Sequence, residues 1–397
     1  MRRLSKQVIV AASLLSSLVG VANAEGLRLP AEMQEYAPFL NAGETIPMTV
    51  DGAESPELGT VVADGYLPQS DAKIRDRHDR FPWSRYAVLD VLYLQTNNAT
   101  KNAPLALQNE STSDSGAVAL STDALESSMA PGLRLFYGSH GDDDLGWEVG
   151  WLGLWSMHAD AAAFGDETLR LPGDLGTIAD SGFDRASAVE PRRNAGLNMI
   201  EVNFFDSCRF GGCDPCAKRA MHRSTDFATA RDWMLGIRWA GLEDTAALDV
   251  TAEVGDEPTS YRVTASSNLI GPQVGYRRHT QWRGWGVETW AKAAVVASIL
   301  SQSQGPVVGP FDGVLIRGPR SVDDEGMGMI GDLNFTIIRR INDTWGVRLG
   351  YNLIWVTGVA LAADQWDFTD TPESGTGLNS TGSLFLQGVN LGLEGRW

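Results

Sequence analysis

His158 and Asp160 are the residues whose types and spacing come nearest to a catalytic pair. Acid–base catalysis needs a base beside a carboxylate that orients it, and these two residues lie two positions apart. The chain has five histidines and 50 acidic residues, so such a pair is expected by chance. The sequence has no Gly-x-Ser-x-Gly elbow, His-Glu-x-x-His zinc motif or phosphate-binding loop. We therefore expect no enzyme activity and no cofactor, with a hydrolase based on His158 as the less favoured alternative.

Three cysteines, Cys208, Cys213 and Cys216, could form a disulfide or bind a metal. Their C-x4-C-x2-C spacing partly resembles an iron–sulfur pattern, but there is no fourth cysteine. In an oxidising compartment we expect one disulfide and one leftover thiol. A metal site completed by His222 is the alternative, and we predict no metal.

The first 24 residues have the features of an export signal. Arg2, Arg3 and Lys6 form a basic start, Val8–Val21 is apolar, and Ala22-Asn23-Ala24 is a small-x-small cleavage site. We predict a signal peptide over residues 1–24, cleaved after Ala24, and export by the Sec pathway. Residues 25–82 have scattered proline and glycine without a sustained period, which indicates an irregular periplasmic segment.

The net charge of the chain is strongly negative. It is −18, and loss of the three basic signal residues takes the 32 Lys and Arg to 29 against 50 Asp and Glu, or −21. This charge argues against nucleic acid as a partner and against anionic membranes as a target. It also indicates that long polar links stay solvated.

From residue 83 onward, the positions of apolar residues alternate as they do in β-strands. Many of the alternating segments exceed the usual 5–6 residues of a globular strand and fit the roughly 9–11 residues that cross a bilayer at a tilt. We predict ten such strands, with twelve as an alternative count. The ten segments are Tyr86–Asn97, Gly132–Ser139, Gly146–Met157, Leu197–Phe205, Phe227–Ala240, Ser260–Arg277, Trp285–Ile299, Gly326–Ile341, Thr344–Ala360 and Ser383–Trp397.

The links between these segments alternate in length. Short links lie at Gly141–Leu145, Thr280–Arg283 and Asn342–Asp343, and long polar links occupy 98–131, 158–196, 241–259, 300–325 and 361–382. Short periplasmic turns and long outer loops are typical of outer-membrane barrels. One link, 206–226, is long where a short turn is expected, so it is either a periplasmic insert or a miscounted strand pair.

The two faces of the clearest segments differ in polarity. In Trp285–Ile299 one face is apolar and the other has Glu288 and Lys292; in Thr344–Ala360 the face opposite Trp345 and Trp355 has Arg348. Aromatic residues near both ends of an apolar face are typical of interfacial girdles. We predict that the charged faces line a narrow lumen. The predicted lumen charges are Asp90, Glu148, Glu201, Arg238, Glu288, Lys292, Asp332, Arg348, Glu394 and Arg396.

The C-terminal strand alternates Leu391, Leu393 and Trp397 on one face. It resembles the terminal signal that the barrel-assembly machinery reads, although phenylalanine is the commoner last residue. Further segments carry a resemblance to a known family: Trp83–Leu94, Leu235–Trp239, Asn268–Gly275, Gly350–Trp355, Gly358–Ala362 and the C-terminus. Together, in this order and over about residues 83–397, they resemble the putative beta-barrel porin family seven, a family of bacterial outer-membrane barrels.

The fold expected is therefore an all-β, antiparallel, up-and-down transmembrane barrel over residues 83–397, located in the cell outer membrane. About eight strands leave a lumen filled by side chains, and 16 or more leave an aqueous channel. Ten strands predict a porin-like or structural, surface-displaying barrel that passes little or no solute. The alternatives are a secreted soluble β-sandwich that binds a partner and a barrel-type outer-membrane hydrolase. The expected partners are outer-membrane lipids and the barrel-assembly machinery, and the oligomeric state is open.

Overall fold

The computed structural model of the chain describes nine stretches of the sequence: 85–97, 102–108, 116–125, 127–140, 145–206, 228–253, 257–282, 284–310 and 313–397. The predicted signal peptide, the predicted irregular segment 25–82 and the three cysteines lie outside these residues. Within them, no helix is long and apolar enough to cross a membrane.

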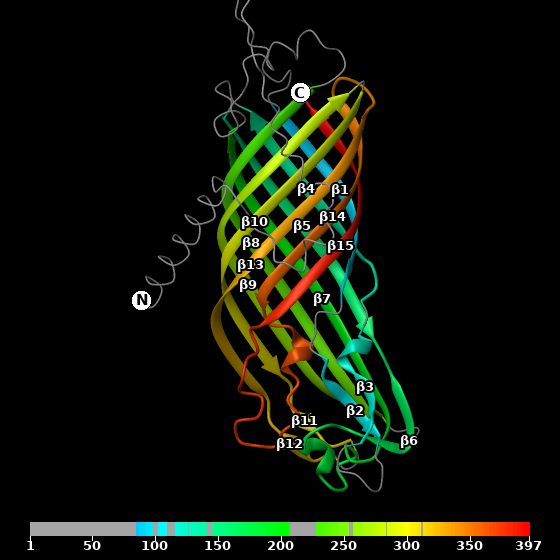
Figure 1. Ribbon diagram of the computed structural model, residues 1–397. Helices are drawn as coiled ribbons and strands as arrows, with labels where there is room; N and C mark the ends of the chain where they lie inside the picture. The colour runs from blue at the N-terminus through cyan, green and yellow to red at the C-terminus, as the bar shows by residue number, and fades with distance from the viewer. Residues whose placement is uncertain are drawn as a thin grey trace, which may run out of the picture. The chain divides into compact units, whose positions relative to one another are not determined.

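Ten long antiparallel strands form a closed barrel (Figure 1). Each strand pairs with its neighbours in the order β7-β5-β4-β1-β15-β14-β13-β10-β9-β8, and the pairing of β8 with β7 closes the ring. The strands are β1 (Arg85–Thr96), β4 (Ala130–His140), β5 (Leu145–Asp160), β7 (Ala186–Asp206), β8 (Ala228–Thr251), β9 (Thr259–Trp282), β10 (Trp285–Gln304), β13 (Arg320–Arg340), β14 (Trp345–Val359) and β15 (Gly382–Arg396). The predicted fold class and the count of ten are confirmed, and the soluble β-sandwich is wrong because a single sheet closes on itself.

The two ends of the barrel differ. At one end, here called the turn end, β1 begins beside the last residues of β15, and short connections join β4 to β5, β9 to β10 and β13 to β14. At the opposite, loop end lie the short elements β2 (Pro104–Gln108), β3 (Val118–Ser121), β6 (Ala163–Arg170), β11 (Val307–Val308) and β12 (Leu315–Arg317) (Figure 1). Short turns are periplasmic and long loops extracellular in outer-membrane barrels, so the turn end faces the periplasm.

Several strands run further toward the loop end than the sequence pattern indicated. β7 begins at Ala186 instead of the predicted Leu197, and β8 ends at Thr251 instead of the predicted Ala240. The links predicted as polar loops at 98–131, 158–196 and 300–325 also include β2, β3, β6, β11 and β12. The loop-end part of β7 pairs with both β8 and β6, so the barrel wall continues beyond the membrane as a sheet.

An inversion of polarity along the strands explains these wrong boundaries. Near the turn end of β8 the outward side chains Leu235 and Ile237 are apolar and exposed, while the inward Arg238 is buried. Farther along the same strand the outward Glu243 is exposed and the inward Leu248 is buried. Lipid surrounds the first part and water the second, so the apolar-outward pattern ends although the strand continues.

The outward apolar side chains form a belt around the turn-end half of the barrel. Along β14 the belt runs from Trp345 to Trp355, and along β8 it runs from Trp233 to Trp239. The stretch along β14 matches the roughly 9–11 residues that a tilted strand needs to cross a bilayer. Aromatic residues at both limits fit the predicted interfacial girdles.

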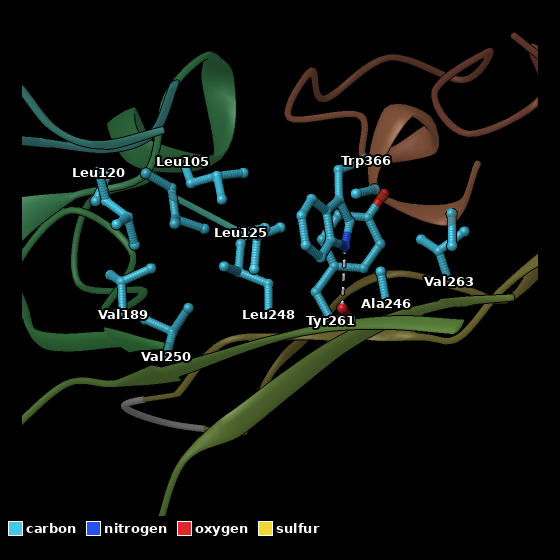
Figure 2. Packing of buried hydrophobic residues seen from close by; sticks show 14 of the residues in the cluster. Leu105, Leu120, Leu125, Val189, Ala246, Leu248, Val250, Tyr261, Val263 and Trp366 are labelled. Atoms are coloured by element: carbon cyan, nitrogen blue, oxygen red, sulfur yellow. Dashed lines mark hydrogen bonds between the residues drawn. The ribbon is translucent and has the colours of Figure 1, made fainter. Parts of the chain in front are cut away.

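The loop end has a hydrophobic core of its own. Inward side chains of β7, β8 and β9 pack against residues from the loops, with Trp366 lying over Tyr261 (Figure 2). The indole Nε1 of Trp366 donates a hydrogen bond to the backbone oxygen of Tyr261, at 3.4 Å. The short helix η4 (Ala362–Gln365) precedes this tryptophan, and η2 (Thr122–Ala124) and η3 (Asp174–Thr177) lie in neighbouring links.

Candidate functional site: the barrel interior

The interior of the turn-end half contains a layer of buried charged side chains, here called the charge layer. All ten of the predicted lumen charges are buried there, at 8% exposure or less. The layer also contains three charges that were not predicted, namely Arg134, Asp232 and Arg277. Every one of the ten barrel strands contributes at least one member, and the seven carboxylates nearly balance the six basic groups.

Ion pairs join the charge layer into two chains. In the first, the Arg277 guanidinium lies 2.6 Å from Glu148 and 2.9 Å from Asp232. The Lys292 ammonium pairs with both Glu148 and Glu201, and this chain continues to Arg238 and Asp332. A buried charge is tolerated only when it is paired and hydrogen-bonded, and each member of this chain has a partner of opposite sign.

Arg348 is the centre of the second chain. Its guanidinium lies 2.7 Å from Glu288, 2.8 Å from Glu394 and 3.4 Å from Asp90. Asp90 also pairs with Arg134 at 2.5 Å, and Glu394 pairs with Arg396 at 2.9 Å. Three carboxylates around one fully buried guanidinium draw β1, β10, β14 and β15 together across the lumen.

Buried amides fill the spaces between the ion pairs, and the predicted set of lumen residues, which was limited to charges, did not include them. Asn334 and Asn352 are hydrogen-bonded at 2.6 Å, and Arg134 donates to Asn352 at 2.6 Å. Asn390, Gln273 and Asn203 belong to the same polar interior. On their strands, Asn334, Asn352 and Asn390 lie an even number of residues from the predicted charges Asp332, Arg348 and Glu394. This shared parity could have identified the three amides as inward-facing.

A glycine makes room for one of these charges. A Cβ at Gly392 would lie 2.1 Å from Oδ1 of Asp90, so only glycine fits opposite this aspartate.

An apolar layer lies next to the charge layer, toward the loop end. It contains buried residues of all ten barrel strands, among them Leu92, Leu197, Leu269, Ile354 and Leu386. These side chains face one another across the lumen, for which the sequence analysis had predicted only a charged lining. Two successive layers, one of paired charges and one of hydrocarbon, therefore occupy the lumen.

A small cavity lies beside the charge layer, at its turn-end side. It is lined by Tyr86, His140 and Glu288 among others and has a volume of about 30 Å³. Since one water needs roughly 10–15 Å³ by this measure, the cavity has room for a few waters.

A network of hydrogen bonds around Tyr261, here called the Tyr261 network, covers the mouth at the loop end. The Tyr261 hydroxyl donates to Gln304 at 2.8 Å and accepts from Arg317 at 2.9 Å. Arg317 also donates to the backbone oxygen of Asp367 at 2.8 Å, and the Gln304 amide donates to the backbone oxygen of Gln365 at 3.0 Å. The link between β14 and β15 is thereby fastened over the core of the loop end.

The Asp367 carboxylate holds the same link in its conformation. Burial alone would raise the pKa of Asp367, but hydrogen bonds from the Thr369 hydroxyl and from the backbone N–H groups of Thr369 and Gly375 lower it below its ordinary value. Burial raises the pKa of Tyr261, so its hydroxyl stays protonated and available as a donor.

Comparison with known families agrees with this geometry. The family model described as Putative beta barrel porin-7 (BBP7) matches residues 90–397. The chain belongs to the BBP7 family. The resemblance found in the sequence from residue 83 onward is thus confirmed, and the BBP7 match covers all ten barrel strands apart from the first residues of β1.

Solved structures similar to this BBP7 protein share little sequence with it. The outer membrane protease OmpT from Escherichia coli is 9% identical, with 80% of this chain and 99% of that chain covered at a TM-score of 0.47. The Pseudomonas putida toluene transporter TodX is 8% identical, covering 80% and 90%, at 0.25. A Pseudomonas aeruginosa FadL homologue is also 8% identical, covering 79% and 90%, at 0.25. No curated protein matches the chain.

The pair His158 and Asp160 lies at the loop-end part of β5 in the BBP7 barrel. Nε2 of His158 is 3.4 Å from Oδ1 of Asp160, and their side chains are 50% and 70% exposed. Both point outward from the barrel wall, because the buried Met157 and Ala159 occupy the inward positions. The structure thus brings the pair together on the outer surface and away from the lumen.

The residues of the predicted assembly signal also point outward. Leu391, Leu393 and Trp397 are all exposed at the turn end of the barrel wall. β15 pairs with β1 on one side and β14 on the other, so the C-terminal strand lies where the ring begins and ends in sequence.

Proposed function

We propose that this BBP7 protein is a closed outer-membrane barrel that passes no solute and holds its loop-end sheet and loops outside the cell. One observation carries the proposal: two successive layers across the lumen, one charged and one apolar, each receive side chains from all ten strands. A solute would have to break several ion pairs and then cross hydrocarbon.

Further features support this proposal. A barrel of about eight strands is filled by its own side chains, and ten is close to that number. The Tyr261 network covers the mouth at the loop end, and the hydrophobic core of the loop end packs against it. The outward surface near this end has exposed acidic residues such as Glu243, Asp323 and Glu325, which suit contact with water.

Solute uptake into liposomes tests the proposal. Vesicles containing the purified full-length protein are transferred into isotonic solutions of small sugars, and swelling is followed by light scattering. We expect swelling no faster than in protein-free vesicles, while a general porin in parallel vesicles gives rapid swelling. Sugar entry at a rate that rises with the amount of protein would contradict the closed barrel.

The proposal includes the absence of catalysis. Both side chains of the His158–Asp160 pair are at least half exposed on the outer face of β5, where no substrate is oriented by surrounding groups. We expect His158→Ala to leave the cleavage of peptide and phospholipid substrates at the level of the unmodified protein. A loss of such activity in this variant would favour the hydrolase instead.

Export and assembly are a further part of the proposal. The basic start, apolar stretch and small-x-small site of residues 1–24 support export by the Sec pathway and cleavage after Ala24. The alternating C-terminal strand supports recognition by the barrel-assembly machinery. N-terminal sequencing of protein from the outer-membrane fraction is expected to begin at Glu25, and an intact Met1 would contradict the cleavage.

A further inference from the structure

Two arginines of neighbouring strands face each other on the outside of the barrel. Arg231 of β8 and Arg278 of β9 are direct cross-strand partners, and both are exposed on the outward face. Directly opposed residues have Cβ atoms about 4.5–5.5 Å apart, and like charges at such positions destabilise a sheet. Among the ion pairs within the described residues, neither arginine takes part. Within the described residues, two positive charges thus lie side by side, and no carboxylate forms an ion pair with either.

The pair lies at the periplasmic edge of the apolar belt. The next outward pair toward the belt is Trp233 and Tyr276, whose rings are 5.1 Å apart. Tryptophan and tyrosine in such positions mark the level of the lipid headgroups, so the two guanidinium groups lie where phospholipid phosphates are.

We propose that Arg231 and Arg278 bind the phosphate of a phospholipid in the periplasmic leaflet. The planar fork of guanidinium matches two phosphate oxygens, and one phosphate between two arginines removes their repulsion. The acyl chains then lie along the outward side chains Leu235, Ile237 and Val274, which are exposed in the belt beyond Trp233 and Tyr276.

The distribution of charge supports this site although the net charge of the chain does not. The total of −18 argues against binding to anionic surfaces in general. However, Arg85, Arg231, Arg278 and Arg339 are all exposed on the outward face at the turn end, and Arg339 stacks on Trp285 at 4.9 Å. The basic rim therefore coincides with the aromatic girdle.

Native mass spectrometry of the full-length protein in detergent tests the proposal, with phosphatidylglycerol as the titrated probe. The variants Arg231→Gln, Arg278→Gln and their combination are compared with Arg262→Gln. Arg262 is also exposed and outward on β9, but it lies at the loop end opposite Ala247. We expect about a fivefold loss of affinity for each rim arginine and about thirtyfold for both, from the usual contribution of one arginine near an anionic lipid surface, and no change for Arg262→Gln.

A second lipid tests the role of the phosphate, and a gel assay checks that the variants are folded. Diacylglycerol, which has the same chains without the phosphate, is expected to bind equally to all variants. Heat-modifiable migration on gels shows that each variant is folded, and if the double variant is not, the two single variants decide the question. The proposal is overturned if Arg278→Gln and Arg262→Gln bind phosphatidylglycerol alike, or if diacylglycerol binds the unmodified protein as tightly as phosphatidylglycerol.

Discussion

At the scale of single residues, the interior depends on buried ion pairs that share partners. Arg348 is the clearest example, since Asp90, Glu288 and Glu394 all pair with it and all are buried. Burying such a group costs several kcal/mol of desolvation, and removal of one partner leaves the others without compensation. The stability of the charge layer is therefore concentrated in a few central cations.

Replacing Arg348 tests how far the stability of the barrel depends on this central cation. Arg348→Ala leaves three carboxylates without their shared partner, and we expect a loss of about 3–5 kcal/mol in the free energy of unfolding. Urea unfolding in lipid vesicles, followed by tryptophan fluorescence, measures it. The matched control is Arg262→Ala on the exposed outer surface of β9, expected within about 0.5 kcal/mol of the unmodified protein. Equal losses for the two variants would mean that the buried pairs contribute little.

The residues of the interior were predictable only where their strands alternated cleanly. Glu288, Lys292 and Arg348 lie opposite long apolar faces, and parity alone placed them inward. Arg277 was missed because its strand has Pro272 and several polar residues on the outward face, which blur the alternation. Which charges pair with which could not be predicted, because partners such as Asp90 and Arg348 come from strands far apart in sequence.

At the scale of elements, β7 and β8 each combine a membrane strand at the turn end with an ordinary water-exposed strand at the loop end. The sequence pattern found the turn-end part, because lipid selects apolar side chains outward. It lost the loop-end part, where the apolar residues point inward as in a soluble sheet. A change of polarity between the two faces, read along one strand, is therefore a signal for the membrane boundary.

Charged substitutions on two outward positions of β8 test this boundary. Leu235 lies in the belt between Trp233 and Trp239, and Thr245 lies outward beyond it. We expect Leu235→Arg to cost about 2–4 kcal/mol, because it puts a charge into hydrocarbon, and Thr245→Arg to cost almost nothing. The free energy of unfolding in vesicles measures both. Similar costs at the two positions would place the membrane boundary elsewhere.

The link that closes the loop end is expected to respond to acid. The pKa of Asp367 is lowered in the folded protein, so its contribution to stability is fully present above the unfolded-state value of about 4 and is lost as the pH falls through the folded value. We expect protease cleavage within 361–381 to increase below pH 4 in the unmodified protein. In Asp367→Asn, cleavage should already be raised at pH 7 and change less with pH. If cleavage of the unmodified protein and of Asp367→Asn increased equally with falling pH, groups other than Asp367 would be responsible for the acid response.

At the scale of the whole molecule, the barrel combines an outer surface made for lipid with an interior made for closure. Ten strands give a narrow lumen. Within the described residues, paired charges and apolar side chains of the strands themselves fill it. Fold class, strand count and family were predictable from the sequence, because alternation and link lengths are repeated ten times. The strand count also predicted little or no passage of solute. The apolar layer was not predicted, because inward apolar residues such as Leu197 and Leu269 differ from lipid-facing ones only in parity.

Single-channel recording in a planar lipid bilayer tests this closure most directly. The full-length protein is inserted from detergent, and its insertion is verified by heat-modifiable migration of the recovered sample. We expect a baseline without steady conductance steps at moderate voltage, because ions meet the charge layer and then the apolar layer in series. Uniform, long-lived conductance steps from the folded monomer would mean that the lumen is open and that the two layers do not seal it.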